Sequence, residues 1–232
     1  MLHTGALSQK SFKKKIYLAI WKSAGLYRHH YFHATDIQEQ AFIQQVFGKA
    51  VKVYVAGNFP RVFSLQQATE KRAGTVNLVS ITLISPMKNI AVVLDALQYC
   101  RCTVHYDLYG PVKDDGYWQQ CLSVIKLLPP HIKVQYHGDV LPEKIAATLR
   151  ASEVFILTSK SENFGHAIFE ALSAGKPVIT SHHTPFNELF QHQAGFNVAV
   201  ETVTEIAKAI VFLQPCLQQN LQTGIGVLTP MH

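Results

Sequence analysis

Glu162 and Glu170 are the acidic residues whose spacing most strongly suggests a chemical role. On a single helix they would lie about 12 Å apart along the axis. That exceeds the roughly 5–9.5 Å between the acid and base carboxyls of a glycosidase. The spacing therefore favours two carboxylates that accept hydrogen bonds from hydroxyl groups at two ends of one ligand. The structural alternative is that Glu162 caps the helix and Glu170 is a solvated helix residue.

The residues after Glu162 predict an anion-binding helix start, which runs through Asn163, Phe164, Gly165 and His166. The first N–H groups of a helix have no partner within the helix, and the helix dipole favours negative charge at this end. Gly165 lets a ligand approach the backbone closely. We expect the N–H groups of this turn to face a phosphate.

Two further loops carry weaker signals. Lys88 follows the first strand of the predicted sheet and is suited to neutralise a diphosphate. The alternative is an ordinary surface lysine. Asp139 and Val140 come after Gly138 at the end of another strand, where a glycine is also common turn chemistry.

Alternating strands and helices must position these residues. The strand Val154–Ser159 begins with a nearly continuous apolar run, which is typical of a parallel strand covered on both faces. The alternation predicts an α/β fold with a doubly wound parallel sheet, whose ligands bind beyond the carboxyl ends of the strands. Predicted strands are 77–84, 103–109, 132–137, 154–159 and 177–181, and predicted helices are 89–100, 114–128, 142–152, 163–174 and 202–214.

The first part of the chain has a different pattern. We expect a helix over 7–28, a second helix from an N-cap at Thr35, with Gln38 completing a capping box, to Phe47, and a strand over 51–56.

Taken together, these segments resemble the C-terminal domain of the retaining GT-B glycosyltransferases, in particular the large fourth family of nucleotide-sugar-dependent enzymes. Glu162 to Glu170 match the Glu-x7-Glu motif of that family, residues 170–179 match the run that follows it, and Lys88 matches the basic residue after the first strand. Residues 1–57 resemble the closing segments of the family's N-terminal domain, and Asn58-Phe59-Pro60 resembles the start of its linker.

The resemblance implies a role for each site residue. Glu162 would lie near the transferred sugar, as the catalytic residue. Lys88 would bind the diphosphate, and Glu170 the ribose hydroxyls. Asp139 and Val140 would lie beside the base. Asn163, Phe164, Gly165 and His166 would present backbone groups to sugar and phosphate. The reaction implied is retaining transfer of a sugar from a UDP- or GDP-linked donor to a glycan or lipid-linked acceptor, with no metal and no cofactor.

The sequence departs from the family at one charged position. The family usually has an arginine five residues before the lysine, paired with it on the diphosphate, and Leu83 stands there. Loss of this donor would cost about 1.5–3 kcal/mol of ligand binding.

The second departure is length, because a first domain of about 150 residues would be expected before the sheet. We therefore expect a remnant of the acceptor-side domain at 1–57, a linker at 58–75, the nucleotide-sugar domain at 76–214 and an irregular tail at 215–232. Three hypotheses follow: a truncated transferase that keeps mainly its donor site, a transferase completed by a partner chain, and an inactive nucleotide-binding or interaction module on the same fold.

The charge distribution bears on location and partners. Six of the 21 basic residues lie before residue 31, and the remaining 15 balance the 15 acidic residues. Residues 10–28 therefore suggest contact with an anionic membrane surface, against the alternative of a solvated helix face. We expect a cytoplasmic protein, peripheral at the inner face of the membrane if that contact forms, with reduced cysteines. No nucleic-acid-binding motif accompanies the charge.

Overall fold

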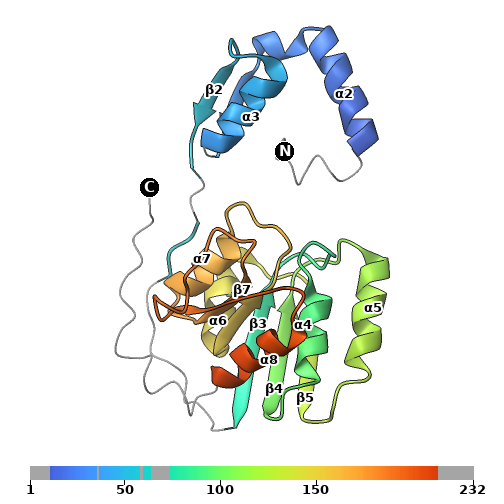
Figure 1. Ribbon diagram of the computed structural model, residues 1–232, viewed down its shortest axis with the longest axis vertical. Coiled ribbons are helices and arrows are strands. Elements are labelled where there is room, and N and C mark those ends of the chain that lie inside the picture. Colours follow the sequence, from blue (N-terminus) through green and yellow to red (C-terminus); the bar gives the residue numbers. More distant parts are fainter. Residues whose placement is uncertain (1–10, 36, 58–59, 64–73, 214–232) are drawn as a thin grey trace. The chain divides into compact units, whose positions relative to one another are not determined.

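The computed structural model describes residues 11–35, 37–57, 60–63 and 74–213. It divides into two compact units, Met1–Phe59 and Pro60–His232 (Figure 1). The predicted tail at 215–232 and most of the predicted linker at 58–75 lie outside the described residues. Within the described part, no helix is both long and apolar enough to cross a membrane.

The smaller unit is a pair of parallel strands packed on a helix. Its elements are α2 (Ser11–Ser23), the 3-10 helix η1 (Leu26–His29), β1 (Tyr31–Ala34), α3 (Ile37–Phe47) and β2 (Lys52–Val55). Strand β1 pairs with β2, and their core contains Ala34, Ile43 and Phe47. Trp21 packs edge-on against Phe47 with 5.4 Å between ring centroids. The expectation of one helix over 7–28 was wrong at its end, because α2 stops at Ser23.

The start of α3 differs in one detail from the predicted capping box. The backbone N–H and the hydroxyl of Thr35 both donate to the Glu39 carboxylate, at 2.9 and 2.8 Å. The residue that accepts these hydrogen bonds is thus the fourth after Thr35, whereas a capping box would use the third, Gln38. The helix itself begins at Ile37. The hydrogen bond from the Thr35 N–H is the main cause that lowers the pKa of Glu39.

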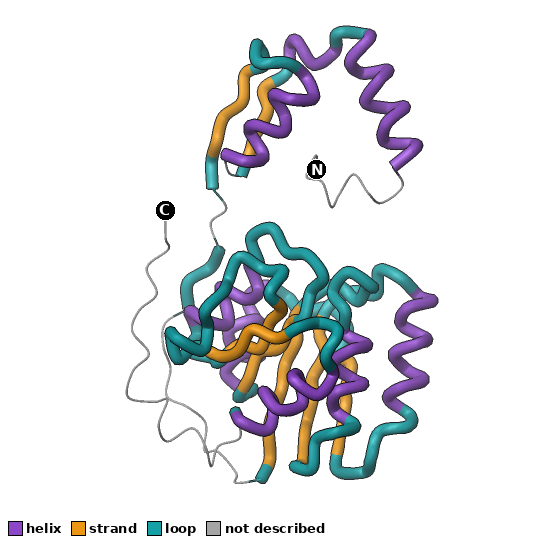
Figure 2. Tube along the Cα trace, viewed as in Figure 1, coloured by secondary structure: helices purple, strands orange, loops and turns teal. Residues whose placement is uncertain are grey.

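The larger unit is a six-stranded parallel sheet in the order β5-β4-β3-β6-β7-β8. Figure 2 shows these strands side by side between helices. The predicted doubly wound α/β fold is confirmed. The strands are β3 (Thr75–Ile81), β4 (Thr103–Tyr109), β5 (Ile132–Tyr136), β6 (Val154–Leu157), β7 (Val178–Ser181) and β8 (Gly195–Val198).

Helices cover both faces of this sheet. They are α4 (Ile90–Leu97), α5 (Asp115–Ile125), η2 (Pro142–Lys144), α6 (Ile145–Ala151), α7 (His166–Ser173) and α8 (Val203–Phe212). Successive β6 side chains alternate between two cores: Val154 and Ile156 join residues of α4, α5 and α8, while Phe155 and Leu157 join residues of α6 and α7. All four are buried, which explains the continuous apolar run.

Gly110 fixes how the ends of β3 and β4 meet. Its φ is +125°, and an added Cβ would lie 1.9 Å from the Thr82 carbonyl oxygen. The N–H of Thr82 donates to the Tyr109 carbonyl at 2.8 Å, and the N–H of Gly110 to the Gly138 carbonyl at 2.7 Å. The loops that leave the sheet are therefore held together by backbone contacts that leave no room for a side chain at this position.

Candidate functional site

The two loops with the strongest predicted chemistry leave neighbouring strands. Strand β3 pairs with β6, although β4 and β5 lie between them in the sequence. The strand order therefore reverses at this pair, and such switch points are where open parallel sheets bind ligands. Two hydrogen bonds join the loops: the N–H of Lys160 donates to the Met87 carbonyl at 2.9 Å, and the Thr158 hydroxyl donates to the Asn89 carbonyl at 3.3 Å.

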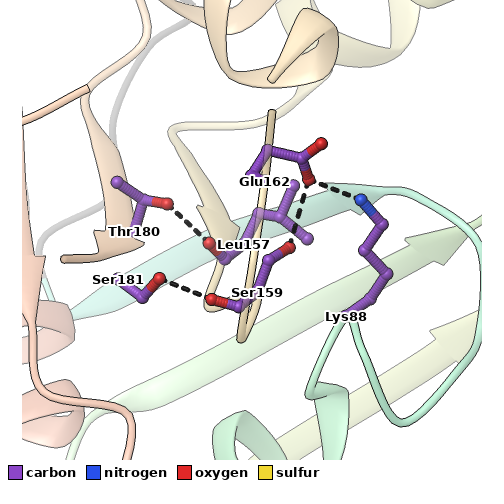
Figure 3. Close-up of polar contacts among 6 residues, drawn as sticks. All are labelled: Lys88, Leu157, Ser159, Glu162, Thr180 and Ser181. Atoms are coloured by element: carbon purple, nitrogen blue, oxygen red, sulfur yellow. Dashed lines mark hydrogen bonds and ion pairs between the residues drawn. The ribbon is translucent and has the colours of Figure 1, made fainter. Parts of the chain in front are cut away.

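Lys88 and Glu162 meet above this switch point. The Lys88 Nζ lies 2.5 Å from the Glu162 Oε2, and the two side chains are only 19% and 16% exposed. The Ser159 hydroxyl donates to the same carboxylate oxygen at 3.3 Å. Figure 3 shows the lysine reaching this carboxylate from the β3–α4 loop. The structure thus brings together an ammonium and a carboxylate predicted to serve one ligand.

Buried hydroxyl groups hold the β6–α7 loop in shape (Figure 3). The Thr180 hydroxyl donates to the Leu157 carbonyl at 2.7 Å, and the Ser181 hydroxyl donates to the Ser159 carbonyl at 2.5 Å. The N–H of Glu162 donates to the His183 carbonyl at 3.0 Å. Because these hydrogen bonds join the loop to the neighbouring strand β7 and to the residues that follow it, they fix the position of Glu162 relative to the sheet.

The helix after Glu162 begins later than predicted. Gly165, at φ +72°, is the N-cap of α7, and the N–H of Phe169 makes the first helical bond to its carbonyl at 2.9 Å. The N–H groups without an intrahelical acceptor therefore belong to Gly165, His166, Ala167 and Ile168. The predicted start at residue 163 was wrong, because the left-handed conformation of Gly165 interrupts helical geometry just before His166.

The left-handed conformation of Gly165 and its close packing disfavour a side chain there. An added Cβ would lie 3.0 Å from Phe186 Cε2 and 3.4 Å from Glu162 Cγ. Asn163 and His166 are exposed, and Phe164 lies with its ring centroid 4.6 Å from that of His166. Asn163, Phe164 and His166 thus border the start of α7.

Glu170 lies one turn beyond His166 on α7 and is half-buried. Burial raises the pKa of Glu170, while the charges of Arg61 and His166 and the backbone N–H of Arg61 act in the opposite direction. Its carboxyl group is therefore close to two basic side chains from different parts of the chain.

Asp139 and Val140 lie in the loop after β5, at the edge of the sheet. The Asp139 Oδ1 accepts a hydrogen bond from the Val140 N–H at 2.9 Å. Two strand spacings, about 10 Å, separate β5 from β3. This loop is thus on the same edge of the sheet as Lys88 and Glu162 but displaced along it, and the role of its residues stays a prediction.

Arg61 was missed by the sequence analysis, which placed it in a linker. Only the tertiary structure shows that Arg61 lies near Glu170, although the apolar residue Phe63, two positions later, was a signal that this segment packs against the core. Leu83, which stands where an arginine was expected, is 43% exposed. Within the described residues, no three His, Cys, Asp or Glu side chains lie together as a metal site would require.

Comparison with solved structures finds proteins that share this fold. Anabaena Alr3699/HepE, solved with UDP and glucose, superposes with a TM-score of 0.65 at 22% identity, over 90% of this chain and 59% of that one. The pneumococcal O-GlcNAc transferase GtfA, solved with UDP and GlcNAc, gives 0.59 at 18% identity over 88% of this chain and 41% of that one. The lipopolysaccharide outer core galactosyltransferase WaaB gives 0.56 at 15% identity over 83% of this chain and 60% of that one.

These identities establish the shared fold, and the chain spans well under two thirds of the length of each of these structures. No curated protein sequence matches the chain. The family described as glycosyl transferases group 1 matches residues 63–214, which include every strand and helix that the structure describes in the larger unit. Since that match covers more than half of its residues, the chain belongs to the glycosyl transferases group 1.

Proposed function

We propose that this chain binds a nucleoside-diphosphate sugar, UDP- or GDP-linked, and serves its transfer to a hydroxyl of a glycan or lipid-linked acceptor with retained anomeric configuration. The observation that carries the proposal is the convergence of Lys88 and Glu162 at the β3/β6 switch point, beside the start of α7. An ammonium next to free helical N–H groups is suited to a phosphate.

The diphosphate is the part of the donor that Lys88 and the start of α7 are best suited to bind. Lys88 supplies a positive charge, and the N–H groups at the start of α7 supply partial positive charge along the helix axis. When the bond between the sugar and the diphosphate breaks, negative charge grows on the leaving oxygen, and fixed donors stabilise it most. Because Glu162 pairs with Lys88, a diphosphate must share that lysine with the carboxylate or replace it as the partner.

The remaining residues are proposed to bind the ends of the donor. Glu162 faces the transferred sugar and is the proposed catalytic residue. Asn163, Phe164, Gly165 and His166 line the sugar and phosphate. Glu170 accepts hydrogen bonds from the ribose hydroxyls, and Asp139 and Val140 lie beside the base. The titles of two similar structures name UDP together with a sugar, which supports a nucleotide-sugar donor.

An inactive nucleotide-binding or interaction module is the alternative from another class. Membership in the glycosyl transferases group 1 favours a transferase over it. The acceptor class, retention of the anomeric configuration, the absence of a metal or cofactor, and contact of residues 10–28 with an anionic membrane remain parts of the proposal.

Retention of the anomeric configuration predicts that the anomeric proton coupling of the product, measured by NMR, matches that of the donor.

The first test is calorimetric titration of the chain with UDP, GDP and their common sugar conjugates. We expect preference for one diphosphate, and Glu170→Ala should weaken its binding by roughly 1–3 kcal/mol, the range for a buried polar group that loses its hydrogen-bond partner. Lys88→Ala should weaken binding similarly through the diphosphate.

Matched controls lie on exposed positions away from the switch point. Glu201→Ala before α8 and Lys126→Ala after α5 remove the same charges and should leave affinity unchanged. If both site variants bind as tightly as the unchanged chain, the site is misplaced. If the unchanged chain binds no nucleotide, the proposed function is wrong.

A further inference from the structure

The segment that opens the larger unit is fastened to α7. The N–H of Phe63 donates to the Ser173 hydroxyl oxygen at 3.1 Å, and that hydroxyl donates to the Glu170 carbonyl at 2.9 Å. The Phe63 side chain also packs against the core cluster that contains residues of α6 and α7. Residues 60–63 are therefore held along the helix that carries Glu170.

Within this segment, Arg61 connects two parts of the proposed donor site. Its Nη1 donates to the Pro142 carbonyl at 2.7 Å. Pro142 begins η2, two residues after Val140 in the loop proposed to lie beside the base. On the other side, both the charge and the backbone N–H of Arg61 act on the Glu170 carboxyl. One residue thus links the helix that carries Glu170 to the loop proposed to lie beside the base.

We propose that Arg61 is a positioning residue of the nucleoside part of the donor site, fixing Glu170 on α7 relative to the loop that ends at Pro142. The inference rests on the proposed function, because it takes the nucleoside of the donor as the ligand served. It adds a residue that lies outside the motifs from which the site was predicted.

The position of Arg61 has two consequences for Glu170. The first is geometric: the ribose and base contacts are held at a preset spacing, so less ordering is needed when the nucleotide binds. The second is electrostatic: the ionised carboxylate accepts hydrogen bonds from two hydroxyls, and burial opposes that ionised form. The positive charge of Arg61 favours it.

This predicts a pH dependence whose sign can be worked out. Burial raises the pKa of Glu170, so the carboxylate is lost, and nucleotide affinity falls, at a higher pH than for an ordinary glutamate. Removal of the Arg61 charge raises this pKa further and moves the loss of affinity to still higher pH. His166, the other basic group that acts on Glu170, lowers the pKa of this carboxyl in every Arg61 variant alike.

The test measures the dissociation constants of UDP and GDP from mildly acidic to neutral pH for Arg61→Gln and Arg61→Lys. At neutral pH Arg61→Gln should weaken the preferred diphosphate roughly two- to fivefold, the effect of an exposed charge pair. The pH below which its nucleotide affinity falls should be higher than in the unchanged chain. Arg61→Lys keeps the charge and should restore the pH profile of the unchanged chain.

The control is Arg101→Ala, because Arg101 is an exposed arginine just before the amino end of β4. This substitution should change neither the affinity for the diphosphate nor its pH profile. If the unchanged chain binds a diphosphate, but Arg61→Gln has the same affinity and pH profile, the inference is overturned and the proposed function stands. If the unchanged chain binds neither diphosphate, both fall together. A merely structural role would lower thermal stability and leave the pH profile in place, which also overturns the inference.

Discussion

At the scale of single residues, the Lys88–Glu162 pair defines the chemistry of the site. Both side chains are largely buried, so either charge would destabilise the folded chain if its partner were removed. A diphosphate that enters this site brings a second anionic partner for Lys88. The loop would bind it best if another cation were present to share that charge, and the sequence has Leu83 where the family usually has an arginine.

We therefore predict that Leu83→Arg strengthens diphosphate binding. Leu83 lies in the β3–α4 loop, five residues before Lys88, and is exposed enough to accept a longer side chain. A guanidinium that donates to a phosphate oxygen should gain about 1.5–3 kcal/mol, and less where solvent screens it. The measurement is the calorimetric affinity of Leu83→Arg for UDP and GDP.

Leu83→Gln provides the neutral comparison, since it adds polarity without charge. A steeper decline of affinity with added salt in the arginine variant would identify the gain as electrostatic. Equal affinity in Leu83→Arg, Leu83→Gln and the unchanged chain would mean that position 83 does not face the diphosphate.

At the scale of elements, the site depends on how the sheet ends. We predict that Gly110→Ala lowers the free energy of unfolding by about 1–3 kcal/mol beyond the cost of the positive φ alone, the range for a side chain forced into a packed position. The reason is that its Cβ would lie 1.9 Å from a backbone oxygen, so the ends of β3 and β4 must move apart. Urea denaturation measures the loss.

Gly74→Ala separates the clash from the cost of backbone conformation. Gly74 also has a positive φ, +80°, but an added Cβ there would meet nothing within 4 Å. Its expected cost is about 1 kcal/mol, that of a left-handed L-residue. Similar losses in both variants would show that the close approach at Gly110 is relieved without displacing the strands.

Strong local patterns made much of this sheet predictable. The buried run of β6 and the regular strand–helix alternation predicted the fold and the approximate positions of five of the six strands described in this sheet. Strands β1 and β8 were missed, since each has only four residues and mixes polar with apolar side chains. Helix α7 was predicted too early because local propensity does not reveal the left-handed Gly165.

In the candidate site, too, local patterns predicted some features, while others depended on tertiary structure. Lys88 and Glu162 could be placed at one edge from the alternation alone, because parallel neighbours end on the same side. Their ion pair depended on β3 lying next to β6, a pairing across more than 70 residues that no local pattern contains. Arg61 was unpredictable for the same reason: its partners, Pro142 and Glu170, lie far along the chain.

At the scale of the whole molecule, the chain has two units with separate cores. The core of the smaller unit is built around Ala34, Ile43 and Phe47. The two clusters of the larger unit lie on opposite faces of its own sheet. All residues proposed to bind the donor, from Lys88 to Glu170, belong to Pro60–His232, as does the positioning residue Arg61. Donor binding should therefore be a property of the larger unit.

We predict that a fragment of residues 60–232 folds cooperatively and binds the preferred diphosphate within about twofold of the affinity of the whole chain, because it keeps every residue proposed to contact the donor. Calorimetry on the fragment and the whole chain measures this, with circular dichroism to establish that the fragment is folded. A folded fragment with clearly weaker binding would show that residues 1–59 contribute to the donor site. Sugar transfer also needs an acceptor surface, so equal binding with lower transfer by the fragment would assign acceptor contact to the smaller unit.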